Sequence, residues 1–153
     1  MLKFFVFLVL NFAALGLGGL LIGNPANDTW YQSLNKAPWT PPGWVFGAAW
    51  FTIMLCFSFF MYYTSNNLPA NFRNTFYVLF AIQFVLNVMW NPIFFKWHFV
   101  LGGLIVIVLL TILIAWFTYY GFKNHGLVGL WVTPYFIWLL IATSLNAYVF
   151  IKN

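Results

Sequence analysis

The sequence has very little charge and only one acidic residue. Of its 153 residues, 5% are Asp, Glu, Lys or Arg, while 64% are hydrophobic. A soluble domain carries about 25% charged residues, and a chain with far fewer cannot cover a water-exposed surface. This scarcity excludes a water-soluble globule and predicts that the bilayer is the solvent of this chain.

Cysteine and histidine are also scarce. Cys56 is the only cysteine, so an intrachain disulfide is excluded and the residue is interpreted as a packing residue. His98 and His125 lie at opposite ends of an expected span, which predicts interfacial packing and no metal site. The six basic residues stand one per span end, which excludes a nucleic-acid surface and is typical of interfacial anchors.

The charged residues divide the chain into long uncharged segments. Between Arg73, Lys96, Lys123 and Lys152 lie 22, 26 and 28 uncharged residues, and a membrane-spanning helix needs about 20. The runs are apolar all round, unlike the alternating strands of a barrel. The first run is too long for a secretory signal and is interpreted as a retained helix. The sequence therefore predicts an all-α integral membrane protein, a five-transmembrane-helix bundle forming a single membrane domain over residues 1–153, with spans over 4–23, 43–63, 76–95, 99–120 and 127–151.

The breaks between these spans have local causes. Asn24-Pro25, the segment 69–74, Lys96-Trp97-His98 and the glycine-flanked segment 121–126 predict the turns, and Pro134 predicts a kink in the last helix. Five spans place the termini on opposite sides of the membrane. The Lys and Arg residues divide three against three between the two sides, so their count predicts no orientation.

The connection over 24–42 is long for a loop between packed helices. It contains the only acid, Asp28, and aromatic residues and prolines that include Trp39, Pro41 and Pro42. An aromatic, proline-rich segment is consistent with an interfacial belt. Its length and the rigidity of its prolines favour a lid over a binding site.

Two spans have polar and aromatic residues on one face. Gln83, Asn87, Trp90 and Phe94 follow helical spacing in the third span. Amides are costly in lipid, so these side chains are expected to face the interior, either as interhelical hydrogen bonds or as a pocket wall.

The fifth span repeats the pattern. Trp138, Ala142 and Asn146 are four residues apart, which suits either ordinary packing or a slot for a flat ligand. Trp50, in the second span, stands nearest the long loop and is expected to form the floor of such a pocket. Together these residues predict an uncharged, tryptophan-lined pocket inside the bundle.

The spans contain no Asp, Glu, Lys or Arg. Proton-coupled transport usually needs a membrane carboxylate, and general acid–base catalysis needs His or a carboxylate with a shifted pKa. The sequence therefore disfavours an ion-coupled transporter and an enzyme of ordinary mechanism.

Three blocks of sequence carry recognisable motifs. The first is Trp30-Tyr31 with Leu34 and Lys36, then Pro38-Trp39-Thr40-Pro41-Pro42 and Trp50. The second is Gln83, Asn87 and Trp90 with Pro92-Ile93-Phe94-Phe95, and the third is Pro134-Tyr135, Trp138, Ala142-Thr143, Leu145 and Asn146. They extend over residues 30–146, nearly the whole chain. Together they resemble the translocator protein family, also called the tryptophan-rich sensory protein or peripheral benzodiazepine receptor family.

The resemblance implies a five-helix bundle, often a homodimer, with a pocket beneath the first loop for porphyrins such as protoporphyrin or haem, as ligands rather than required cofactors. The matching positions are Tyr31, Pro41, Trp50, Asn87, Trp90, Trp138, Ala142 and Asn146. Animal members bind cholesterol through a C-terminal motif, but here the tyrosine, Tyr148, stands one position later, which weakens the expectation of sterol binding.

The sequence and the resemblance are consistent with three functions. The leading hypothesis is a membrane receptor or sensor that binds porphyrins and acts in tetrapyrrole regulation or transport, since flat aromatic ligands suit tryptophan faces. The second is a light- and oxygen-dependent catalyst of porphyrin breakdown that uses Trp50 and Trp138, as the resemblance implies for some members. The third is facilitated passage of hydrophobic ligands or sterols.

Overall fold

The computed structural model describes residues 2–22 and 27–153, and in this part of the chain five helices are long and apolar enough to cross a membrane. All five predicted spans are confirmed as helices. The predicted stop at Asn24-Pro25 lies outside the described residues. In chain order the elements are α1 (Leu2–Ile22), α2 (Thr29–Ser33), α3 (Gly43–Asn66), the 3₁₀ turn η2 (Ala70–Phe72), α4 (Arg73–Asn91), the π turn η3 (Pro92–Lys96), α5 (Val100–His125), the 3₁₀ segment η4 (Gly126–Trp131) and α6 (Thr133–Lys152).

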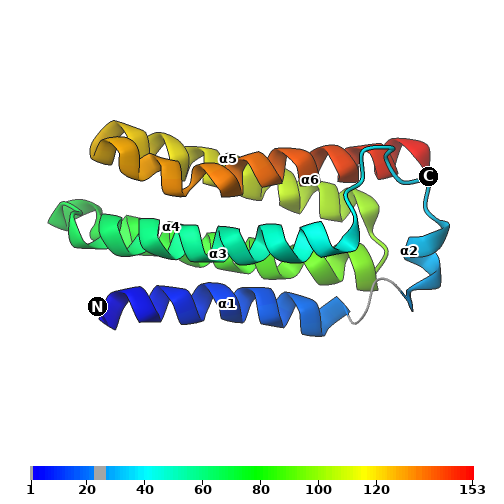
Figure 1. Cartoon of the computed structure of the whole chain (residues 1–153), viewed down its shortest axis with the longest axis horizontal. Helices are drawn as coiled ribbons and strands as arrows, with labels where there is room; N and C mark the ends of the chain where they lie inside the picture. Colours follow the sequence, from blue (N-terminus) through cyan, green and yellow to red (C-terminus); the bar gives the residue numbers. More distant parts are fainter. Residues whose placement is uncertain (1, 23–26) are drawn as a thin grey trace.

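The five long helices run side by side as an elongated bundle (Figure 1). Helix α1 packs on α3 and α4, and α5 packs on α4 and α6. The N-terminal end of α1 and the C-terminal end of α6 lie at opposite ends of the bundle, as five spans require. Near the first of these ends, the Lys3 ammonium donates to the Asn66 side chain over 3.0 Å. The multi-pass membrane architecture predicted from the sequence is therefore confirmed.

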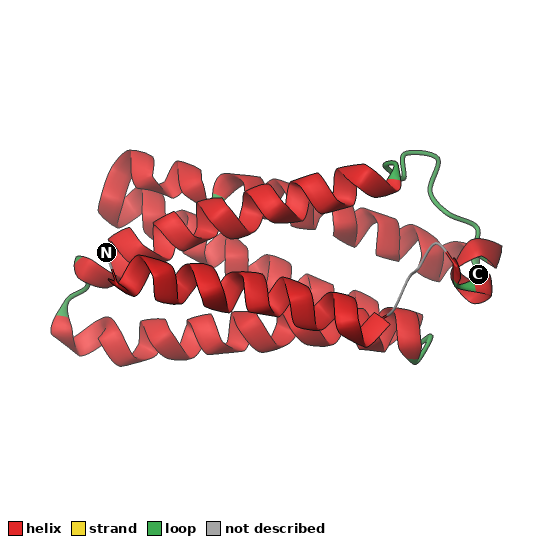
Figure 2. Cartoon of the chain, turned by 60° about the horizontal axis from the view of Figure 1, so that its bottom comes forward, coloured by secondary structure: helices red, strands yellow, loops and turns green. Residues whose placement is uncertain are grey.

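The short helix α2 and the loop over 34–42 lie at the end of the bundle where the C-terminus of α6 is found (Figures 1 and 2). Asp28 begins α2, since its carboxylate accepts hydrogen bonds from the backbone N–H groups of Trp30 and Tyr31 at 2.9 and 3.3 Å. A carboxylate at this position satisfies amides that the first turn leaves free. The only acid of the chain therefore fixes the start of α2, and the loop that follows returns the chain to the start of α3.

Helix α4 ends in a π turn at Pro92. Proline lacks an N–H and interrupts the regular helical ladder, and the Trp97 N–H bonds to the Pro92 carbonyl five residues earlier at 2.9 Å. The following residue, His98, has a φ of 51°, in the left-handed region. The chain reverses there, so the predicted turn at Lys96-Trp97-His98 is confirmed.

The prediction for the last turn was wrong. Helix α5 continues through Gly121 to His125, and the 3₁₀ segment η4 precedes α6, which begins at Thr133 rather than at Leu127. A Cβ on Gly121 would lie 2.9 Å from the Gly129 Cα atom, so this glycine serves close packing of η4 on α5. Gly126, with a φ of 59°, supplies the break.

The predicted kink at Pro134 is absent. Pro134 is the second residue of α6. In the first turn of a helix the missing N–H has no partner to lose, so proline begins this helix instead of bending it.

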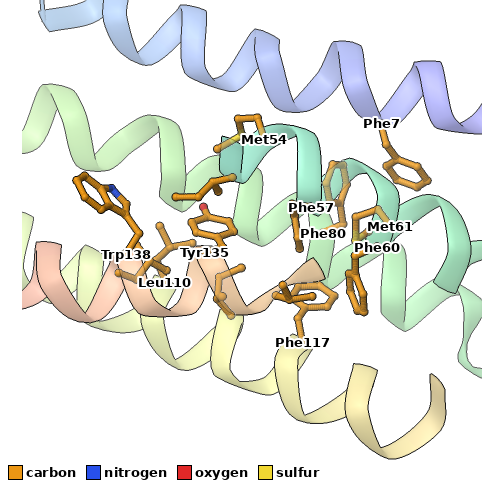
Figure 3. Close-up of a cluster of buried hydrophobic side chains, with 14 of the residues drawn as sticks. Phe7, Met54, Phe57, Phe60, Met61, Phe80, Leu110, Phe117, Tyr135 and Trp138 are labelled. Carbon is orange, nitrogen blue, oxygen red and sulfur yellow. The ribbon is translucent and has the colours of Figure 1, made fainter. Parts of the chain in front are cut away.

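The centre of the bundle is packed with aromatic rings. Phe57, on α3, contacts Tyr135 on α6 and Phe117 on α5 edge to face, with ring centroids 5.4 and 5.7 Å apart. All three side chains are fully buried. In Figure 3 the cluster reaches from Trp138 at one end to Phe60 and Phe117 at the other. Phe57 therefore joins three helices.

Two hydrogen bonds between buried side chains join different helices of the bundle. The Asn11 amide on α1 donates to the Ser58 hydroxyl on α3 over 2.9 Å, and both residues are buried. The Gln83 amide on α4 donates to the Tyr135 hydroxyl over 2.9 Å. These bonds are consistent with the interhelical role that the sequence left open for Gln83.

We expect Phe57→Ala to lower the free energy of unfolding by about 3 kcal/mol, the low end for a buried ring because the bilayer also solvates an apolar side chain. The measurement is denaturant or thermal unfolding in detergent. Phe59→Ala is the matched control, because Phe59 is exposed on the same helix. Equal loss in both variants would contradict a core centred on Phe57.

Candidate functional site

A cavity lies beneath the loop over 34–42, between the ends of α4 and α6. It encloses about 40 Å³, room for about three water molecules. Its walls come from α2, the loop, α3, the end of α4 with its π turn, and α6. The lining residues are Tyr31, Lys36, Thr40, Phe46, Trp90, Phe94, Phe95, Ala142, Leu145, Asn146 and Val149.

Two polar atoms of the lining residues lack a partner. The Trp90 indole N–H and the Asn146 side-chain oxygen are buried and have no hydrogen-bond partner among the described residues. The Asn146 amide nitrogen donates to the Ala142 carbonyl over 3.1 Å, so only its oxygen is left over. An unpaired buried polar group is costly and calls for an explanation. The cavity thus offers one donor and one acceptor to whatever enters it.

One wall of the cavity is a cluster of aromatic rings placed by the π turn. Trp90 and Phe94 are stacked with centroids 5.9 Å apart and planes 16° apart. Phe94 also contacts Trp30 at 5.6 Å, and Phe95 contacts Tyr31 at 5.2 Å. Helix α2 is therefore seated on the rings of the π turn. Such a wall suits the face of a flat aromatic molecule.

The predicted uncharged pocket is incorrect in one respect, because Lys36 lines this cavity. Its ammonium lies 4.7 Å above the centre of the Tyr31 ring and donates to the Gln32 carbonyl over 3.3 Å. Burial raises the pKa of the Tyr31 hydroxyl above its ordinary value. Tyr31 therefore stays a neutral hydrogen-bond donor, and the cavity carries one cation.

Helix α2 and the loop over 34–42 are held to the bundle by hydrogen bonds and a ring stack. The Asn35 backbone N–H donates to the Asn153 side chain over 2.9 Å, and the Trp39 indole N–H donates to the Ser144 hydroxyl over 3.1 Å. On the other side Trp30 stacks on His98, with ring centroids 4.0 Å apart. These contacts hold α2 and the loop against the bundle beside the cavity, and the lid expected from the sequence stays a prediction.

His98 is part of this fastening. Its Nε2 lies 4.0 Å from the Asp28 carboxylate, and its ring stacks on Trp30. No group of metal-ligating side chains occurs in the described ranges. The packing role expected for His98 from the sequence is confirmed.

The structure brings together five residues of the predicted site. Tyr31, Trp90, Phe94, Ala142 and Asn146 all line the cavity, from α2, the end of α4 and α6. They come from segments far apart in the sequence, as a pocket inside the bundle requires.

The other predicted residues lie elsewhere. Trp39 is 54% exposed on the outer side of the loop, and neither Pro41 nor Pro42 lines the cavity. Gln83 bonds to Tyr135 deeper in the bundle, and Asn87 is buried with its carbonyl accepting from Asn91.

Trp50 and Trp138 also do not line the cavity. Trp50 packs against Tyr135 with centroids 5.8 Å apart, and Trp138 packs edge to face on Phe46 at 5.2 Å. The expectation that Trp50 forms the pocket floor is therefore wrong, since Phe46, one helical turn earlier, takes that place.

The site analysis from sequence missed six lining residues. Leu145 and Val149 follow Ala142 by three and seven residues, so helical spacing alone could have found them. Phe95 neighbours Phe94, but only the π turn brings it to the cavity. Lys36, Thr40 and Phe46 depend on the path of the loop, which local patterns do not encode.

The fold and the site define a class of protein: a multi-pass α-helical membrane protein with a small aromatic pocket inside the bundle, covered by an ordered loop. The model of the TspO/MBR family matches residues 5–151. The chain belongs to the TspO/MBR family, which the sequence analysis predicted.

Relatives from bacteria, archaea and animals are similar over most of the chain. Protein CrtK of Rhodobacter capsulatus is 35% identical over 81% of this chain and 78% of its own length. The tryptophan-rich protein TspO of Archaeoglobus fulgidus is 31% identical over 95% and 94%. The human translocator protein is 31% identical over 81% and 75%. The chain is thus consistent with a sensor or translocator role.

We expect Asn146→Leu to leave the unfolding free energy unchanged or raise it by about 0.5–1 kcal/mol, because it removes an unpaired buried oxygen. Gln83→Leu is the comparison variant: it also removes an unpaired buried oxygen, but it breaks the bond to Tyr135 and leaves that hydroxyl without its partner, so it is expected to lower stability by a similar amount. Thermal unfolding of both variants in detergent tests this. A loss in Asn146→Leu as large as in Gln83→Leu would show that Asn146 is a structural residue.

Proposed function

We propose that this protein binds porphyrins, such as protoporphyrin or haem, in the cavity beneath the loop, and acts in tetrapyrrole regulation or transport. The observation that carries the proposal is an unpaired indole donor and an unpaired amide acceptor among the residues of one aromatic-walled cavity. A porphyrin matches these features, since it has a flat aromatic ring, pyrrole nitrogens and carboxylates. Membership of the TspO/MBR family, with relatives named sensory and translocator proteins, supports the same assignment.

The cavity must expand to accept such a ligand. Its 40 Å³ compares with about 300–1,000 Å³ for pockets that enclose drug-sized molecules. The loop is held to α6 by the Asn35–Asn153 and Trp39–Ser144 contacts at its exposed side, and exposed hydrogen bonds contribute little to stability. Binding therefore requires the lid or the helices beside it to move apart until the cavity is several times larger.

Photochemical breakdown of porphyrin has less support. The two tryptophans that the family resemblance assigns to it, Trp50 and Trp138, do not line this cavity, and their rings pack on Tyr135 and Phe46. The homodimer implied by the resemblance stays a prediction.

Titration of the purified protein in lipid nanodiscs with protoporphyrin, followed by the Soret band, tests the proposal. We expect Trp90→Phe to weaken binding by about tenfold, since it keeps the ring and removes the unpaired donor. Trp44→Phe is the matched control, because Trp44 is 75% exposed at the start of α3. Absence of saturable binding by the unmodified protein would disprove the proposal.

The cation at the cavity predicts selectivity for an anionic ligand. We expect Lys36→Gln to weaken binding of protoporphyrin by about fivefold to tenfold, because the ammonium then no longer pairs with a carboxylate. Binding of protoporphyrin dimethyl ester, which lacks the charge, should be the same in both proteins. An equal loss for the acid and the ester would indicate that Lys36 only supports the fold of the loop.

A further inference from the structure

A second hollow lies on the side of the bundle, between α3 and α6. It measures about 610 Å³, against about 40 Å³ for the cavity under the loop. Small or apolar residues form its walls, including Ala48, Ala49 and Thr52 on α3 and Ile137, Trp138 and Ile141 on α6. Ile137 is 51% exposed and Ala48 is exposed as well, so the groove opens on the outer face of the bundle, which the bilayer covers.

The groove and the inner cavity share a wall. Phe46 lines the cavity and Trp138 lines the groove, and these two rings contact each other edge to face, with centroids 5.2 Å and planes 82° apart. On α6 the neighbours Ile141 and Ala142 likewise line the groove and the cavity. The Phe46–Trp138 ring pair therefore stands between the groove and the cavity, beside the backbone of α6.

A polar atom in this wall has no partner. Trp138 is 7% exposed, and its indole N–H is buried without an acceptor among the described residues. Hydrocarbon offers no hydrogen-bond partner, so an unpaired donor beside a lipid-facing groove is costly. A ligand carrying a hydrogen-bond acceptor would satisfy it. The groove thus suits a flat, largely apolar molecule with an acceptor atom.

The alternative entrance is at the loop, and more contacts close it than the single Phe46–Trp138 ring pair that closes the groove side. There the Asn35–Asn153 and Trp39–Ser144 hydrogen bonds hold the loop to α6 and its end, and the Trp30–His98 stack holds α2 to the turn before α5. A largely apolar ligand also partitions into the bilayer before it meets the protein. The concentration of such a ligand is then highest at the lipid-facing side, where the groove lies.

We infer that the groove between α3 and α6 is the membrane entrance of the inner cavity. An apolar ring-bearing ligand dissolved in the bilayer occupies the groove first and reaches the cavity when the Phe46–Trp138 pair separates. The inference rests on the proposed function and adds the route of the ligand. Because an entrance affects entry and exit equally, obstructing it slows binding and leaves the equilibrium affinity unchanged.

The test compares rates and affinities in proteoliposomes. Protoporphyrin is added, and its binding is followed by tryptophan quenching and the Soret shift, with uptake into protein-free liposomes measured separately. Ala48→Trp fills the groove. We expect it to lower the association and dissociation rates by about tenfold at the same Kd. Ala81→Trp is the matched control, because Ala81 is exposed on α4, outside the groove.

Asn153→Ala distinguishes the two routes, since it removes the contact that holds Asn35 and loosens the lid. The expected result is an unchanged rate in Asn153→Ala together with slow binding in Ala48→Trp. Faster binding in Asn153→Ala with a normal rate in Ala48→Trp would overturn the inference and place the entrance at the loop.

Should Ala48→Trp fail to fold, Ala48→Leu obstructs the groove with a smaller change. Absence of porphyrin binding by the unmodified protein would refute the proposed function itself, whereas normal binding at an unchanged rate in the filled variant would refute only the entrance.

Discussion

The structure depends on one constraint: in hydrocarbon, polar groups must find their partners within the protein. The bundle meets this constraint with few bonds, such as those from Asn11 to Ser58 and from Gln83 to Tyr135, which join helices distant in the sequence. The remaining interior is apolar and rich in aromatic rings. Six buried side-chain atoms have no partner among the described residues: those of Trp90, Asn146 and Trp138 lie in residues that border a hollow, whereas those of Thr64, Gln83 and His125 lie in residues that line neither hollow.

The same constraint explains what the sequence could predict. Charged residues are confined to span ends, so their positions gave the five helices with errors of a few residues. Local patterns predicted the last turn incorrectly. They indicated a break at Gly121, whereas this glycine packs against Gly129, which the local sequence does not show. The sequence analysis placed Pro134 in a helix interior because it began the last span at Leu127. In the structure η4 occupies that segment, so α6 begins only at Thr133.

The site was predicted in part. Helical spacing identified Trp90, Phe94, Ala142 and Asn146, because these residues share faces that point inward. It could not say that Trp138, four residues from Ala142, borders a different hollow, nor that Lys36 returns to the cavity through the loop. Both facts depend on how α3 and α6 pack against each other and on the path of the loop, which are properties of the assembled bundle.

The π turn at Pro92 has a consequence for how the site is built. A π turn contains one residue more than an α-helical turn, so the side chains after it are rotated about the helix axis relative to those before it. Phe94 and Phe95 therefore take their directions from the turn and from α2, which is seated on them. The orientation of these two rings is therefore set by one irregular turn and by the short helix packed on it, and the regular period of α4 does not determine it.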